Sequence, residues 1–213
     1  MTWDVLVVGA GAAGMAAALA ATQAGASVLL ADRGERLGGV LPQCLHTGFG
    51  MGIFHQELTG ADYAARWADM VRAAPLSLCL DTTVLSLTPD RRALLSGRSG
   101  VEEISFQALV LAAGCREIPI GALALPGTRP AGIFTAGQAQ RMVNLQGLSL
   151  GRRIVILGSG DVGLIMARQF ALAGCSVEAV VEQRDRCGGL PRNYQQCIQA
   201  CGIPLLTRTT VSC

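Results

Sequence analysis

Two stretches of the sequence each combine three closely spaced glycines with an acidic residue roughly twenty positions further on. Residues 9–14 read GAGAAG and are followed by Asp32, and residues 158–163 read GSGDVG and are followed by Glu182. In such a motif the first glycine makes a tight turn, the second lets a pyrophosphate approach the backbone, and the third lets a helix pack closely on a strand. The N–H groups at the start of that helix bind phosphate, and the carboxylate accepts hydrogen bonds from ribose hydroxyls. A single copy is weak evidence, but two copies predict two dinucleotide sites.

A cysteine and a histidine in the connection after the first motif are candidates for catalysis. Cys44 would be a nucleophile if its pKa were lowered, and His46 would act as a general acid or base near neutral pH. The alternatives are that Cys44 is a small buried residue and that His46 stabilises the loop. His55 is interpreted as an ordinary loop or surface residue.

The residues around Glu182 bear on the identity of the second dinucleotide. A carboxylate at this point favours the free 2′-hydroxyl of NAD and repels the 2′-phosphate of NADP. Arg184 and Arg186 follow closely and would suit a phosphate instead, or simply form a solvated turn. NAD is therefore the preferred interpretation, and NADP is the alternative.

The composition limits the chemistry and the partners. The chain has 213 residues, of which 51% are hydrophobic and 15% charged, with a net charge of +2. It can bury a core, but it has no charge excess that would attract nucleic acid or an anionic membrane. All basic residues are Arg, so Schiff-base chemistry on lysine is excluded. The eight cysteines form no C-x-x-C pair, which argues against a zinc ribbon or a thioredoxin-type centre. No metal is expected, and a cytoplasmic location with reduced thiols is the default.

Each glycine motif follows a predicted buried strand and begins a predicted helix. Residues 5–31 contain no charge, but the glycines within that run suit a turn better than a membrane span. No membrane insertion is therefore expected, and the run is interpreted as a strand, a turn and a buried helix. The strand, helix and strand expected around the motifs are 4–8, 12–24 and 27–31 in the first copy, and 153–157, 164–173 and 176–181 in the second.

The sequence between the two copies predicts further elements. Residues 33–60 form a long connection, of a kind that is usually functional. An amphipathic helix is expected over residues 61–73, with Trp67 and Met70 facing inward. Strands are expected at 76–80 and 82–87, a hairpin at 91–106, a buried strand at 108–113, and a short helix within 137–148.

With these features the chain resembles the two-dinucleotide-binding-domain flavoproteins of the pyridine nucleotide-disulfide oxidoreductase superfamily. The resemblance rests on both glycine motifs with their acids, on Gly38-Gly39, and on the strand ending in Ala112-Ala113-Gly114, where the superfamily has Ala-Thr-Gly. In that superfamily the first unit binds FAD, and the second binds NAD(P)H and is inserted into the FAD domain. The resemblance implies an α/β fold: a FAD-binding Rossmann-like domain with an inserted, partial NAD(P)-binding Rossmann-like domain. The implied bounds are 1–120 for the N-terminal part of the FAD-binding domain, 121–150 for a crossover linker, and 151–213 for the partial NAD(P)-binding domain.

Several shorter stretches are similar to a bacterial subgroup of FAD/NAD(P)-dependent oxidoreductases often encoded near enzymes that oxidise glycerol 3-phosphate. These stretches are residues 38–50, 57–60, 134–144 and 188–193. Two departures from the superfamily matter. The loop after Gly38-Gly39 has Cys44 without a neighbouring partner cysteine, which disfavours a thiol–disulfide relay. The superfamily also continues beyond the position of Cys213, so the chain is expected to be incomplete.

The resemblance implies electron transfer between NAD(P)H and a small-molecule or redox-protein substrate through bound FAD. The alternatives are a nucleotide-binding remnant without independent activity, a disulfide reductase that uses Cys44, and one subunit of a hetero-oligomeric dehydrogenase; a homodimer is also considered. The loop that carries Cys44 and His46 would run near the isoalloxazine ring. The residues implied to bind FAD are Gly9, Gly11, Ala13, Gly14, Asp32, Arg33, Gly38, Gly39, Val84, Ala113 and Gly114, and those implied to bind NAD(P) are Gly158, Gly160, Asp161, Val162, Gly163 and Glu182.

Overall fold

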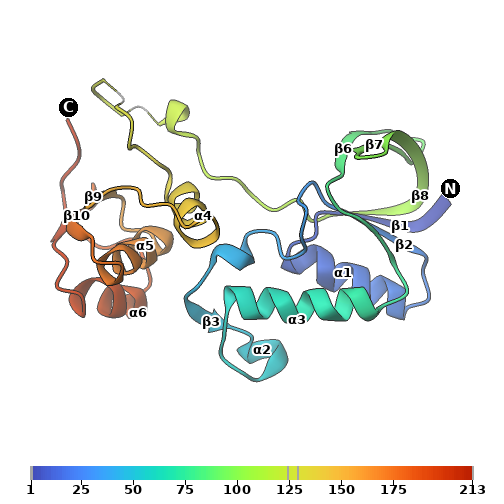
Figure 1. Ribbon diagram of the computed structural model, residues 1–213, viewed down its shortest axis with the longest axis horizontal. Helices are drawn as coiled ribbons and strands as arrows, with labels where there is room; N and C mark the ends of the chain where they lie inside the picture. The colour runs from blue at the N-terminus through green and yellow to red at the C-terminus, as the bar shows by residue number, and fades with distance from the viewer. Residues whose placement is uncertain (1, 124, 129, 213) are drawn as a thin grey trace. The chain divides into compact units, whose positions relative to one another are not determined.

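The chain forms two compact units, which are described separately. The computed structural model describes residues 2–123, 125–128 and 130–212 (Figure 1). Unit 1 comprises Met1–Cys115 and unit 2 comprises Arg116–Cys213. Within the described residues, no helix is long and apolar enough to cross a membrane.

Unit 1 is built on a mixed sheet in which parallel strands carry the first glycine motif. The strand order is β5-β2-β1-β8-β7-β6. Strand β1 pairs in parallel with β2 on one side and with β8 on the other, whereas β6, β7 and β8 pair antiparallel. The strands are β1 (Thr2–Val8), β2 (Val28–Ala31), β5 (Ser77–Cys79), β6 (Thr83–Leu87), β7 (Arg92–Gly97) and β8 (Gly100–Leu111).

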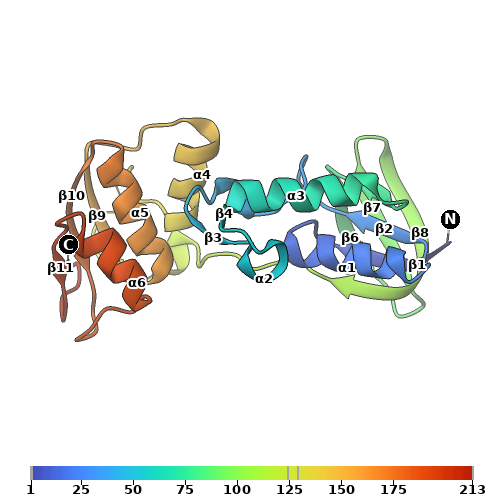
Figure 2. The ribbon, with the colours of Figure 1, turned by 90° about the horizontal axis from the view of Figure 1, so that it is seen from below.

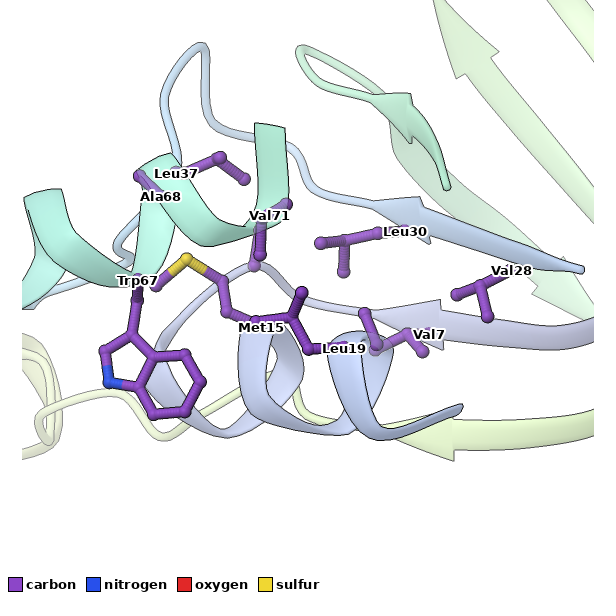
Figure 3. Close-up of a cluster of buried hydrophobic side chains, with 11 residues drawn as sticks. Val7, Met15, Leu19, Val28, Leu30, Leu37, Trp67, Ala68 and Val71 are labelled. Carbon is purple, nitrogen blue, oxygen red and sulfur yellow. The ribbon is translucent and has the colours of Figure 1, made fainter. Parts of the chain in front are cut away.

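Two helices lie side by side on one face of this sheet, α1 (Ala12–Gln23) and α3 (Gly60–Ala73) (Figure 2). Helix α1 ends just before Gly25, whose positive φ of 87° suits glycine. Thr59 caps the N-terminus of α3, and its hydroxyl accepts the N–H of Asp62. The side chains that the two helices and the sheet bury together form one cluster (Figure 3), with Val7, Met15, Leu19, Val28, Leu30, Leu37, Trp67, Ala68 and Val71 among them.

One of the two side chains expected to face inward from α3 does so, and the other does not. Trp67 is buried with 8% of its surface exposed, but Met70 is 42% exposed, so the expectation for Met70 is wrong. The buried stripe of α3 follows Ala64, Trp67, Ala68 and Val71 at helical spacing, and Met70 lies to the side of it.

A second buried cluster of unit 1 joins residues of the parallel and the antiparallel strands. Leu6 and Leu29 from the parallel strands pack there with Leu95 and Phe106 from β7 and β8. The hairpin expected at 91–106 and the strand expected at 108–113 share one strand, since β8 runs unbroken from Gly100 to Leu111. Its first half pairs with β7 and its second half with β1, so one strand serves both structures.

The long connection after β2 contains short elements and a group of aromatic rings. Helix α3 supplies Tyr63 and Trp67, and both rings contact Phe54 from the connection. The guanidinium of Arg66 lies over the Phe54 ring at 5.4 Å. The elements of the connection are a 3₁₀ turn η1 (Leu41–Gln43), β3 (Thr47–Phe49), α2 (Met51–Phe54) and β4 (Leu58–Thr59), with β3 and β4 antiparallel.

Unit 2 is a smaller parallel sheet with its helices packed on it. The strand order is β11-β10-β9. The segment expected to be a crossover linker contains α4, and α4 and α5 contribute to the same buried cluster through Ala139, Leu164 and Phe170. The elements are a 3₁₀ turn η2 (Ile120–Ala122), α4 (Ala136–Gln146), β9 (Arg153–Leu157), α5 (Asp161–Leu172), β10 (Ser176–Val181), α6 (Pro191–Asn193), a π-helical turn η3 (Tyr194–Gln199) and β11 (Leu205–Leu206).

Candidate functional site

The first glycine turn joins β1 to α1 and shows why each glycine is needed. Gly9 has a φ of 105°, and a Cβ there would clash with the carbonyl oxygen of Ala112. A Cβ on Gly14 would clash with the carbonyl oxygen of Gly9, so the third glycine brings α1 close to β1. At Gly11 a Cβ would meet nothing within 4 Å. The open space beside Gly11 is what the approach of a pyrophosphate requires.

The Asp32 carboxylate, which directly follows β2, is hydrogen-bonded to this glycine turn. Its Oδ2 accepts the N–H of Ala10 at 2.5 Å, and its Oδ1 accepts the N–H of Gly34 at 2.6 Å. A carboxylate has about four acceptor positions, so Asp32 retains capacity for ribose hydroxyls. Arg33, the next residue, is exposed.

The Gly38-Gly39 pair lies against the same turn, although it is distant in sequence. Gly38 is buried and donates its N–H to the carbonyl of Ala10 at 2.8 Å. A Cβ on Gly39 would lie 3.0 Å from the Cα of Gly11. The chain after β8 also reaches this place, since the peptide of Ala112 and Ala113 borders Gly9.

The remaining residues implied to bind FAD take different positions in unit 1. Ala13 is exposed in the first turn of α1, and Gly114 is exposed with a φ of 70°. Val84 lies on the edge strand β6, and its side chain packs on the cluster that contains Leu6 and Phe106. A contact between Val84 and FAD would therefore have to use its backbone, and the assignment stays a prediction.

The second glycine turn joins β9 to α5 and repeats this arrangement with one addition. A Cβ on Gly163 would lie 2.8 Å from the carbonyl oxygen of Gly158, whereas a Cβ on Gly160 would meet nothing within 4 Å. The third glycine again allows close packing, and the second again leaves open space. Val162 is exposed in the first turn of α5. The added feature is the hydroxyl of Ser159, which stands where the first turn has Ala10 and is fully buried.

The carboxylate of Glu182 is buried against this turn and accepts three hydrogen bonds from its own chain. Its Oε2 accepts the N–H of Ser159 at 3.0 Å and the Ser159 hydroxyl at 2.5 Å, and its Oε1 accepts the N–H of Arg184 at 2.9 Å. These hydrogen bonds, that of the Ser159 hydroxyl first, lower the pKa of Glu182 from 4.5 to about 2. Glu182 is therefore charged at neutral pH.

A segment after β10, residues 187–193, packs on the second glycine turn. Gly188 donates its N–H to the Ser159 hydroxyl oxygen at 2.8 Å. The N–H of Leu190 and the Nδ2 of Asn193 both donate to Oδ1 of Asp161, each at 2.7 Å. The motifs alone did not identify Ser159, Gly188 or Asn193 as part of this site. A signal was present, since a Gly-Gly pair begins six residues after the acid in both halves, at Gly38 and at Gly188.

The two residues predicted to be catalytic lie in the long connection of unit 1. Cys44 is half-buried, with its Sγ 3.7 Å from the carbonyl oxygen of Val40, and burial raises the pKa of its thiol. A raised pKa is the opposite of what a nucleophile needs. His46 has Nδ1 2.9 Å from the carbonyl oxygen of Thr47, and its ring contacts Phe49 at 5.2 Å. Both catalytic roles stay predictions. The structurally described residues contain no group of three His, Cys, Asp or Glu side chains that could hold a metal.

The fold and its two glycine turns define a protein with two Rossmann-like units, each shaped for a dinucleotide. The family model for pyridine nucleotide-disulphide oxidoreductases matches residues 3–212, and the chain belongs to this family. The family uses FAD and NAD(P)H. These findings confirm the α/β fold and the family resemblance expected from the sequence.

The chain is similar to parts of larger proteins. It is 30% identical to the alpha subunit of sarcosine oxidase from Rhizobium meliloti (strain 1021) over 200 residues, which cover 87% of this chain and 19% of that protein. It is 27% identical to an opine oxidase subunit of the same strain, over 81% of this chain and 37% of that protein. Among solved structures, the thioredoxin reductase of T. acidophilum matches with a TM-score of 0.76 and 21% identity, over 99% of this chain and 66% of that chain. The chain thus spans well under half the length of these two curated relatives.

Proposed function

We propose that the chain binds FAD at the glycine turn of unit 1 and NADH at the glycine turn of unit 2, and that it takes part in electron transfer between NADH and a further substrate. The observation that carries this proposal is the parallel between the two turns. In each, the acid at the end of the second strand is hydrogen-bonded to the residue between the first two glycines, Ala10 or Ser159. In each, the space beside the second glycine is open.

The residues of unit 1 fit the adenosine and pyrophosphate parts of FAD. Gly11 leaves room for the pyrophosphate, and the first turn of α1 offers free N–H groups and the positive end of the helix dipole. Asp32 is held in place by Ala10 and Gly34 and would accept the ribose hydroxyls. When bound, the flavin supplies the redox chemistry. The chain's own contribution is to bind and orient the cofactor.

The residues of unit 2 fit NADH in the same way, with Gly160 and the first turn of α5 as the phosphate site. The charged Glu182 would accept hydrogen bonds from the 2′-hydroxyl and repel a 2′-phosphate, which favours NADH over NADPH. Arg184 and Arg186 are exposed beside it and are the residues that would favour NADPH instead. The ratio of the two dissociation constants, measured by titration of the FAD-loaded protein, decides between them.

The decisive experiment is to purify the chain, add FAD and record the visible spectrum before and after anaerobic addition of NADH. The proposal expects bound flavin absorption that is bleached by NADH. A protein that remains colourless after incubation with FAD would contradict it. Bound flavin that NADH does not reduce would leave only the nucleotide-binding alternative.

A second candidate is that the chain works as one subunit of a larger oxidase or dehydrogenase. The names of two relatives support it, because both are subunits, and the chain covers only part of each. Co-purification of a second polypeptide that accelerates reoxidation of the NADH-reduced flavin would support this candidate. The disulfide-reductase alternative has weaker support, because burial raises the pKa of the Cys44 thiol.

A further inference from the structure

The Asp161 carboxylate lies where a negative charge would oppose nucleotide binding. Asp161 is the first residue of α5 and directly follows Gly160, beside which the structure leaves open space. The N–H groups of this first turn are those expected to bind a pyrophosphate. A carboxylate within a Debye length of a pyrophosphate repels it, and the repulsion is stronger where water is partly excluded.

Two donors hold that carboxylate on the segment formed by residues 187–193. The Nδ2 of Asn193 and the N–H of Leu190 both reach the same oxygen, Oδ1, at 2.7 Å. The close packing of Gly189 keeps the segment in place, because a Cβ there would lie 2.6 Å from Cδ1 of Leu164 and 2.9 Å from Oδ1 of Asp161. The carboxylate is thus hydrogen-bonded to neutral donors on the side of residues 190–193.

Unit 1 offers an internal comparison. The residue that follows the second glycine there is Ala12, which carries no charge. The equivalent Gly-Gly segment makes a backbone hydrogen bond to the turn, from Gly38 to Ala10. The side-chain donor occurs in the unit whose turn carries the acid.

We propose that Asn193 is a positioning residue that fixes the Asp161 carboxylate on segment 187–193 and so keeps its charge from the pyrophosphate of the nicotinamide nucleotide. This inference rests on the proposed binding of NADH by unit 2. Without the amide of Asn193, the Leu190 N–H is the one remaining donor of the pair, and the carboxylate has more freedom to rotate about its side-chain bonds toward the phosphate site. The cost of nucleotide binding then includes the repulsion between two anions.

The test is a double-variant series on the FAD-saturated protein, with NADH affinity measured by calorimetry. Asn193→Ala should weaken NADH binding about tenfold, because the less restrained carboxylate repels the bound pyrophosphate. Asp161→Asn alone keeps the backbone N–H in the first turn of α5 and removes only the side-chain charge, so it should bind NADH at least as tightly as the wild type. The double variant D161N/N193A should return to within about threefold of the wild type, because the charge that Asn193 restrains is gone. Raising the salt concentration should reduce the defect of Asn193→Ala, because salt screens the repulsion.

Asn144→Ala is the matched control, since it removes an asparagine of the same unit that hydrogen-bonds Gln169 between α4 and α5. It should leave the NADH dissociation constant unchanged. If Asn193→Ala destabilises the fold, the isosteric Asn193→Asp places a second carboxylate against Asp161 and should weaken binding at least as much. The inference is overturned if Asn193→Ala binds NADH like the wild type, or if the double variant stays as weak as Asn193→Ala. Absence of NADH binding by the wild type would instead overturn the proposed function, and this inference with it.

Discussion

The Ser159 hydroxyl and the Glu182 carboxylate lie 2.5 Å apart, and both groups are buried beneath the second glycine turn. Ser159 also accepts the N–H of Gly188, so its oxygen links the acid to the segment that covers the turn. Within residues 2–123, 125–128 and 130–212 the first turn has no such side-chain link, because Ala10 occupies the equivalent position and the donors to Asp32 are the backbone N–H groups of Ala10 and Gly34. The two dinucleotide sites therefore share their geometry but differ in how firmly the acid is held.

The central glycines of the two turns should affect binding without affecting the fold. A Cβ at Gly11 or Gly160 meets nothing within 4 Å, and the φ values of −73° and −67° suit alanine. Gly11→Ala should weaken FAD binding at least tenfold while the free energy of unfolding changes by less than about 1 kcal/mol. Gly160→Ala should weaken NADH binding and leave FAD binding unchanged. Flavin fluorescence measures the change in FAD binding, and urea unfolding measures the change in the free energy of unfolding.

Two further glycine variants serve as controls for that experiment. Gly52→Ala also adds a methyl group in open space, and it should change neither quantity. Gly14→Ala would drive a methyl group into the carbonyl of Gly9, so it should destabilise unit 1 by about 2–3 kcal/mol. Loss of stability in Gly11→Ala comparable to that in Gly14→Ala would contradict the assignment of Gly11 to the ligand.

The periodic parts of the fold could be predicted from the sequence, and the contacts between distant segments could not. Glycine spacing and apolar runs predicted both strand–helix–strand units, and β9 and β10 begin and end where expected. The interior position of Met70 was predicted wrongly, because Met70 lies beside the buried stripe of α3 and not in it. The partnership of Asp161 with Asn193 links residues 32 positions apart, and no local pattern specifies it. The repeated spacing of the Gly-Gly pair pointed to the segment around Gly188 but not to this contact.

Glu182 should contribute to stability in a pH-dependent way. Its folded-state pKa, about 2, lies below its ordinary value of 4.5. The contribution is therefore full above about pH 4.5 and is lost as the pH falls through the folded-state value. Glu182→Gln should lower the free energy of unfolding by about 2 kcal/mol at pH 7, as expected for hydrogen bonds to a buried charged group. The difference in the free energy of unfolding between Glu182→Gln and the wild type should shrink as the pH is lowered from 4.5 toward 2, because Glu182 then becomes protonated.

Urea unfolding at pH 7 and pH 3 checks this prediction, with Glu178→Gln as the control. Glu178 lies on β10, four residues before Glu182, but forms an exposed ion pair with Arg153, so its replacement should have a much smaller effect at pH 7. A Glu182→Gln difference that stays constant between the two pH values would show that the carboxylate is not held as the hydrogen bonds indicate.

Trp67 should tolerate loss of its indole N–H but not of its ring. Nε1 is buried and finds no hydrogen-bond partner among the residues that the structure describes. Trp67→Phe removes this group without breaking a hydrogen bond. It should lower the free energy of unfolding by only about 1 kcal/mol, mainly through lost ring volume. Trp67→Ala opens a cavity beside Met15 and Val71 and should cost about 3–5 kcal/mol. Chemical unfolding followed by circular dichroism measures both, and equal costs for the two variants would show that Nε1 has a partner.

Cys44 should behave as a protonated, slowly reactive thiol. Burial raises its pKa above the ordinary 9.0, whereas Cys115 is exposed. Because the thiolate is the reactive form, iodoacetamide should label Cys115 first at pH 7, and Cys44 labelling should accelerate only above about pH 9. Cys44→Ser should then leave NADH-driven flavin reduction within about twofold of the wild type, since the transfer needs no thiol. Mass spectrometry of the labelled peptides reports the order of reaction. Rapid labelling of Cys44 at pH 7, with loss of NADH-driven disulfide reduction in Cys44→Ser, would instead favour the disulfide-reductase alternative.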